Sequence, residues 1–281
     1  MILRKYTINE TYFDNIDTPN KAYFLGFLYA DGYISRDNHT INMTLQKEDT
    51  YILQKFLDEI SPDKKLQYIK SQDKFRLVIC SKYMCDSLEK AGCYQAKTFT
   101  LKFPNLEQKM YSHFIRGYFD GDGSLYLNTF SKTTQVQLDF VGANDFIIGL
   151  HNYILTIFDI NCKVRIANTK NTIKNVYRLR YGGRLNSVKI LSYLYDDKGD
   201  FFLTRKYEKF LLILNYKKDK YPKACLDKCI IDNCSNQFHA FGLCEKHYYK
   251  FIYWRKVIGM TIEWFKEVYN KKLKEIRDEN R

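Results

Sequence analysis

The chain has 281 residues, 45% hydrophobic and 16% aromatic, which excludes a globally disordered polypeptide and allows one large domain or two ordinary ones. Its 45 Lys and Arg against 32 Asp and Glu give a formal net charge of +13, so we expect a polyanionic partner, nucleic acid before an anionic membrane surface. The sequence has no long apolar run, and its N-terminal stretch is too polar for a signal peptide. We therefore expect no membrane partner and a cytoplasmic location.

Residues 1–105 form the first predicted domain, an αββαββα unit. Apolar periodicity and turn residues predict, in chain order, a helix over 20–30, a strand pair over 33–46, a helix over 48–60, strands over 65–70 and 74–81, and a helix over 82–91. An irregular stretch over 95–105 ends the unit and contains Pro104.

Residues 106–216 form the second predicted domain and repeat this order. The expected elements are a helix over 106–120, strands over 124–130 and 134–141, a helix over 145–158, strands over 162–168 and 175–181, and helices over 184–195 and 202–216. The repeat predicts an α+β fold made by an internal duplication with a period of about ninety residues.

The predicted strands alternate apolar and polar residues. Ile41, Met43 and Leu45, for example, are separated by polar residues, which indicates antiparallel sheets with one face on helices and one face open. An ordinary solvated face is the simpler interpretation of any one strand, but several such faces in a basic chain favour contact with base edges and phosphates. The residues expected to bind DNA on these faces are Thr40, Asn42, Thr44, Lys74, Arg76, Gln135, Gln137, Asp139, Lys163, Arg165, Arg178 and Arg180.

Two predicted helices carry small residues four positions apart, Gly26 with Ala30 and Gly117 with Gly121. Small residues at this spacing let two helix backbones approach closely. We therefore expect these two helices to pack against each other through their small residues. Their C-terminal ends should then converge.

An aspartate and a glycine end each of these helices in "FLYADG" and "YFDGDG". Gly32 and Gly123 stand where a left-handed glycine commonly ends a helix. Asp31 and Asp122 would add negative charge to the negative ends of two helix dipoles, an arrangement that a structure would not build for stability. Paired carboxylates with carbonyl oxygens suit Mg²⁺, so we expect a catalytic Mg²⁺ site that hydrolyses phosphodiesters.

The segments "FLGFLYADG" (24–32) and "IRGYFDGDG" (115–123) resemble the two signature motifs of the LAGLIDADG homing endonuclease family. The resemblance covers roughly residues 6–216. It implies a monomer whose pseudo-twofold-related halves form a saddle over a double-stranded DNA site and cut both strands across the minor groove. It also implies that Asp31 and Asp122 are the catalytic metal ligands, and that Tyr29 and Asp120 occupy a structural position of the motif.

The resemblance assigns roles to three more residues. Lys97 in "YQAKTFTL" and Lys206 in "FLTRKYEKF" match basic residues near the scissile phosphates. Gln46 resembles a polar residue that positions water in the active site. The second half offers only Ala143 or Asn144 at the matching place, so its partner for Gln46 is in doubt.

Two other functions suit the same scaffold. An RNA-binding intron maturase would use intron RNA as its partner, and a cleavage-inactive regulator would bind DNA without cutting it. The presence of both aspartates and both lysines in the sequence favours an endonuclease over an inactive regulator. A maturase activity could coexist with cleavage.

Residues 217–281 form the third predicted domain. Cys229, Cys234, Cys244 and His247 have the spacing of a closed, tetrahedral Zn²⁺ site, with Cys225 and His239 as rival ligands. Reduced cysteines in a small hydrophobic cluster are the alternative interpretation. The zinc site is favoured because a short polar segment needs a cross-link, such as a bound metal ion, to fold. Arg255 and Lys256 follow among aromatic residues and are expected to bind DNA, before a final helix over about 261–277.

Overall fold

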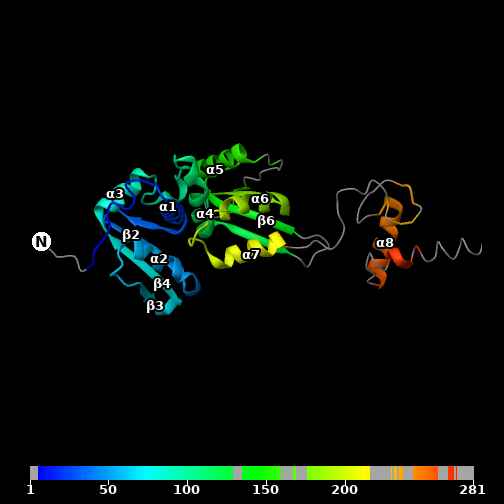
Figure 1. The fold of residues 1–281 in the computed structure, drawn as a ribbon, viewed down its shortest axis with the longest axis horizontal. Helices are drawn as coiled ribbons and strands as arrows, with labels where there is room; N and C mark the ends of the chain where they lie inside the picture. Colours follow the sequence, from blue (N-terminus) through cyan, green and yellow to red (C-terminus); the bar gives the residue numbers. More distant parts are fainter. Residues whose placement is uncertain are drawn as a thin grey trace, which may run out of the picture. The chain divides into compact units, whose positions relative to one another are not determined.

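The computed structural model describes residues 6–128, 135–158, 160, 167–168, 176–215, 229, 231–232, 234–236, 243–258, 265–268 and 270. Its contacts divide the chain into two compact units, Met1–Tyr216 and Lys217–Arg281. The first unit holds two similar halves, coloured blue to cyan and green to yellow in Figure 1.

The first half is a four-stranded antiparallel sheet with helices. Its elements are α1 (Pro19–Asp31), β1 (Tyr33–Ser35), β2 (Thr40–Gln46), α2 (Thr50–Ile60), β3 (Gln67–Ile69), β4 (Lys74–Cys80) and α3 (Lys82–Lys90). The strand order is β1-β2-β4-β3. Short 3₁₀ turns precede α2, follow β3 and cover Lys97–Phe99.

The second half repeats this arrangement. Its elements are α4 (Tyr111–Asp122), β5 (Ser124–Asn128), β6 (Gln135–Ala143), α5 (Asn144–Ile157), β7 (Ala167–Asn168), β8 (Val176–Gly182), α6 (Arg184–Tyr195) and α7 (Thr204–Asn215). The strand order, β5-β6-β8-β7, matches that of the first sheet. The predicted α+β fold with two αββαββα units is therefore confirmed.

The helix α4 begins five residues later than the sequence predicts. A 3₁₀ turn over Gln108–Met110 occupies the place of its first turn. The backbone N–H of Leu106 donates instead to the hydroxyl of Tyr111, at 3.1 Å. Because of this bond, Leu106 belongs to the connection between the halves and not to the helix.

The strand alternation separates a buried face from a polar face in each sheet. Ile41 and Met43 of β2 are each 1% exposed, and Leu138 and Phe140 of β6 are fully buried. The polar residues between those of β2 are half-buried on the other face. Each sheet therefore packs its apolar face on helices, as the alternation predicts.

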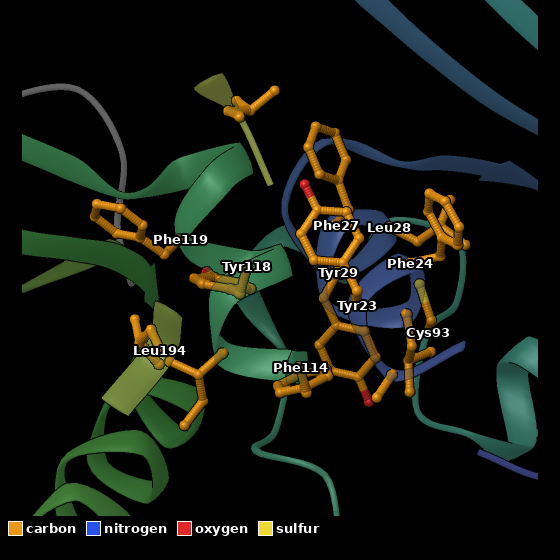
Figure 2. Packing of buried hydrophobic residues seen from close by; sticks show 14 of the residues in the cluster. Tyr23, Phe24, Phe27, Leu28, Tyr29, Cys93, Phe114, Tyr118, Phe119 and Leu194 are labelled. Atoms are coloured by element: carbon orange, nitrogen blue, oxygen red, sulfur yellow. The ribbon is translucent and has the colours of Figure 1, made fainter. Parts of the chain in front are cut away.

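The helices α1 and α4 lie side by side between the two sheets (Figure 1). A Cβ atom added at Gly26 would lie 2.0 Å from the carbonyl oxygen of Phe114, and one at Gly117 would lie 1.9 Å from that of Tyr23. The two backbones therefore touch, and the predicted packing through small residues is confirmed. Figure 2 shows the aromatic residues around this contact. The rings of Tyr29 and Phe114 pack edge to face there, with their centroids 5.0 Å apart.

The expected left-handed conformation of Gly32 and Gly123 is wrong. Both are extended, with φ −75° and ψ 135° at Gly32 and φ −77° and ψ 150° at Gly123, because each helix passes directly into a strand. Both positions require glycine because neighbouring atoms leave no space for a Cβ atom. A Cβ atom would lie 2.6 Å from the Leu28 oxygen at Gly32 and 2.1 Å from a ring carbon of Phe119 at Gly123.

The second unit contains α8 (Glu245–Ile258) and a small apolar cluster that includes Phe251 and Phe265. The predicted final helix lies largely outside the described residues, although residues 265–268 are helical. Among the helices that the structure describes, none has the length and apolar character needed to cross a membrane.

The contact between α1 and α4 yields a stability prediction. Gly117→Ala should lower the free energy of unfolding by about 3 kcal/mol, because the new methyl group forces the two backbones apart. Gly182→Ala is the matched control, since a Cβ atom there meets nothing within 4 Å. Urea titration of both variants measures the difference. Equal stability of the two variants would contradict the close backbone contact.

Candidate active site and cysteine–histidine cluster

Asp31 and Asp122 are the last residues of α1 and α4, and both side chains are exposed at the surface. A Cβ atom added at Gly121 would lie 3.3 Å from Oδ2 of Asp31. The carboxylate of Asp31 therefore lies over the last turn of α4. The packing of the two helices brings the two acidic ends together.

The surroundings raise the pKa of both carboxyl groups. Although both reach solvent, desolvation by the neighbouring protein and then the negative charge of Asp31 raise the pKa of Asp122 to about 6. Desolvation also raises the pKa of Asp31, while the positive charges of Lys206 and Lys97 act in the opposite direction. Two carboxylates that repel each other at two helix C-termini can bind a hard divalent cation, which would neutralise them.

The two predicted lysines hold the ends of the same helices. The buried Nζ of Lys206 donates to the carbonyl oxygens of Asp120, at 2.8 Å, and Gly123, at 2.7 Å. The Nζ of Lys97 likewise donates to the carbonyl oxygen of Gly32. Burial lowers the pKa of Lys206 to about 8. Each lysine thus satisfies carbonyl groups that a helix end leaves open, directly beside a motif aspartate.

Gln46 has no polar counterpart in the second half. Asn42 of β2 and Asp139 of β6 are equivalent, because each pairs with the residue two positions after a motif aspartate. Four residues further along the strands stand Gln46, which is exposed, and Ala143, which is 1% exposed. The two halves therefore differ at this position.

The two halves also differ two residues before each motif aspartate. Asp120 is buried, and its Oδ2 accepts hydrogen bonds from the Tyr23 hydroxyl and the Leu203 N–H, both at 2.8 Å. Burial raises its pKa to about 6. At the equivalent place, the Tyr29 hydroxyl donates to the carbonyl oxygen of Ala91, at 2.6 Å. Both side chains therefore bind protein groups.

The predicted DNA-binding residues on the sheets are partly engaged with one another. Asp139 is only 7% exposed, and its carboxylate accepts from Nε and Nη2 of Arg180, at 2.9 Å and 2.7 Å. The structure places the remaining described residues on the polar faces, with Arg76 and Gln135 exposed and Thr40, Asn42, Thr44, Lys74, Gln137, Arg178 and Arg180 half-buried. Lys163 and Arg165 lie outside the described residues. Their contacts with DNA stay predictions.

Arg205 is a residue of this site that the sequence interpretation missed. It belongs to the second half, yet its Nε lies 3.0 Å from Oδ2 of the buried Asp49, which directly precedes α2 of the first half. Its positive charge also acts on Asp31. The adjacent Arg and Lys in "TRKYEK" were the only signal, and adjacency gives no information about the contact with Asp49.

The four predicted zinc ligands come together in the second unit. One ligand atom from each of Cys229, Cys234, Cys244 and His247 lies within 4.8 Å of every other. The thiols of Cys229 and Cys244 lie 3.3 Å and 3.4 Å from Nδ1 of His247. Three sulfur atoms and one imidazole nitrogen fit a closed tetrahedral metal site.

The remaining predictions for this unit lie beyond what the structure describes. Cys225 and His239, the rival ligands, fall outside the described residues. Arg255 and Lys256 belong to α8, but their side chains are not among those described. Their roles stay predictions.

Comparison with known proteins gives a fold. No protein-family model and no curated protein matches the chain. Among solved structures, the meganuclease I-SmaMI, bound to uncleaveable DNA, has a TM-score of 0.50 at 10% identity, with 70% of this chain and 89% of that chain covered. The LAGLIDADG homing endonuclease I-LtrWI, bound to its target DNA, has a TM-score of 0.44 at 14% identity, with 73% and 90% covered. The LAGLIDADG meganuclease I-AabMI, bound to uncleaved DNA, has a TM-score of 0.45 at 12% identity, with 70% and 89% covered. Over 70% of its length the chain therefore has the fold of the meganuclease I-SmaMI.

Proposed function

We propose that this protein is a site-specific, double-strand DNA endonuclease of the LAGLIDADG homing type. The observation that carries the proposal is the convergence of Asp31 and Asp122 at the C-terminal ends of two helices in backbone contact. Each helix end belongs to one of two equivalent halves, and each half carries one sheet with a polar face. A duplex has two strands to cut, so two equivalent acidic ends match its symmetry.

Asp31 and Asp122 would hold catalytic Mg²⁺ through their carboxylate oxygens. When bound, Mg²⁺ supplies activation of water and stabilisation of the leaving oxygen. Lys97 and Lys206, each bonded to a helix end beside these carboxylates, add positive charge where charge develops on the phosphate. Gln46, exposed at the end of β2, orients water beside the first-half site.

The polar sheet faces would bind the duplex as a saddle, so that cleavage takes place across the minor groove. The excess of 13 positive charges supports a partner with a phosphate backbone. Both halves are parts of one chain, so a monomer is sufficient for both cuts. The cysteine–histidine cluster would bind one structural Zn²⁺, and its unit would lengthen the contact with DNA.

Replacement of either motif aspartate tests the catalytic assignment. Asp31→Asn and Asp122→Asn should each abolish double-strand cleavage and leave DNA binding largely intact, because each removes a metal ligand without changing side-chain shape. Asp58→Asn is the matched control, since Asp58 is exposed on α2 outside the site. Cleavage assays and gel-shift titrations measure the two properties. Full cleavage by both motif variants would exclude the proposed site.

A randomised duplex library with Mg²⁺ would identify the target, because sequencing of the cut ends reports cleavage and recognition together. Selection of bound but uncut duplexes would favour a regulator. Selective binding of intron RNA would favour a maturase.

The raised pKa of Asp122 predicts pH-dependent metal binding. Its carboxyl group, with a pKa of about 6, is charged at pH 7 and mostly protonated at pH 5. Because protons then compete with the cation, the Mg²⁺ affinity should fall about tenfold from pH 7 to pH 5. Calorimetric titration with Mg²⁺ at both pH values measures this fall, and Asp122→Asn should reduce it. A constant affinity in the intact protein would contradict the assignment.

Zinc content tests the cysteine–histidine cluster. Cys244→Ser should release the bound zinc, because three ligands hold the ion much less tightly than four. Cys80→Ser is the matched control, since Cys80 is an exposed thiol of the first unit. Atomic emission of the purified proteins gives the stoichiometry. The same zinc content in both variants would rule out this ligand set.

A further inference from the structure

The segment from Asp200 to Lys206, which we name the anchor segment, comprises the end of the connection between α6 and α7 and the first residues of α7. It ends at Lys206, whose Nζ reaches the carbonyl oxygens at the end of α4. The position of this amino group therefore depends on how the anchor segment is held.

The first set of contacts comes from α4, in the same half. The buried Arg116 donates from Nε to the carbonyl oxygen of Phe201, at 2.9 Å. One turn later, the buried Asp120 accepts from the backbone N–H of Leu203, at 2.8 Å. The helix thus presents a donor and an acceptor, four residues apart, to complementary backbone groups of the anchor segment.

The second set comes from the first half. The hydroxyl of Tyr51, on α2, accepts from the Thr204 N–H at 2.6 Å and donates to the carbonyl oxygen of Phe202 at 3.0 Å. The neighbouring Asp49 accepts from Nε of Arg205. Three residues shortly before Lys206, namely Phe202, Thr204 and Arg205, are therefore bonded across the interface between the halves.

Lys97 is held differently. The hydrogen bonds that the structure describes around it stay within the first half, from Tyr29 to Ala91, from Arg36 to Gln95 and from Lys97 to Gly32. Within the part of the chain that the structure describes, the turn that holds Lys97 packs on β6 of the second half, but only the segment before Lys206 is hydrogen-bonded to both halves.

We propose that Tyr51 and Asp120 are positioning residues that jointly set Lys206, so that a residue of the first half controls the cut made with the lysine of the second half. The inference rests on the proposed endonuclease function. Neither side chain needs to touch DNA for this role. Each acts through backbone groups of the anchor segment, and a shift of about 1 Å in a reacting group can slow a reaction about a hundredfold.

Strand-resolved nicking under single-turnover conditions tests the proposal on a duplex selected from the library, with each strand carrying its own label. Lys97→Met and Lys206→Met first assign one strand to each lysine. Tyr51→Phe, which removes only the hydroxyl, should then slow the strand assigned to Lys206 about tenfold and the other strand less than about twofold. Tyr83→Phe is the matched control, because its hydroxyl bonds to Asp14 within the first half.

Asp120 supplies a rescue test. Asp120→Leu should slow the same strand, whereas Asp120→Asn keeps an oxygen for the Leu203 N–H and should restore its rate to within about threefold of the wild-type rate. Equal slowing of both strands by Tyr51→Phe, or equal defects in the two Asp120 variants, would overturn the proposal.

Hydrogen exchange at the Leu203 and Thr204 amides reports the anchoring without cleavage. Exchange at Thr204 should rise in Tyr51→Phe, and exchange at Leu203 should rise in Asp120→Leu but not in Asp120→Asn. Unchanged exchange in Tyr51→Phe and Asp120→Leu would overturn the anchoring itself. A wild-type protein with protected amides that cuts no duplex would overturn the endonuclease function, and strand control with it. Normal cleavage without strand bias in the variants would overturn the inference alone.

Discussion

The backbone contact between α1 and α4 is the constraint on which the rest of the first unit depends. With no side chain at Gly26 or Gly117, each helix touches the carbonyl oxygen of the other, and the two acidic ends are brought together. The contact also gathers two negative helix termini at one place, which is unfavourable without cations. Lys97 and Lys206 offset part of this charge from within the protein. The residual negative charge is the physical basis of the proposed metal site.

The duplication preserves the positions of the elements but changes the chemistry of several equivalent residues. In α4 the pair Arg116 and Asp120 binds a backbone segment through charged groups, whereas the same places in α1 hold the apolar Leu25 and the hydroxyl of Tyr29. Buried charged groups need hydrogen-bonding partners, and the anchor segment supplies several of them, while Oδ1 of Asp120 has none in the described part of the chain. Among the described residues, the second half therefore buries more charged side chains than the first.

Much of this architecture was predictable because it is local. Strand alternation and the spacing of small residues predicted most elements to within a few residues. The spacing of the cysteines and His247 predicted which four ligands lie together. The conformation of Gly32 was not predictable, because a helix that runs directly into a strand cannot be told from a capped helix by sequence. The contact of Tyr51 with Thr204 joins residues 153 positions apart and leaves no local pattern. Arg116 and Asp120 were visible as charged residues of this helix, but nothing in the sequence indicated that both are buried.

The helix contact also has a consequence for the order of folding. Gly26 and Gly117 are far apart in the chain, so their meeting closes a long loop, and the entropy lost on closure rises with loop length. The hairpins and helices within each half need much shorter loops and can form first. A half that has folded alone would hold one acidic helix end without its partner. The proposed nuclease competence would then arise only when the two halves meet, and a chain that held one folded half would lack it.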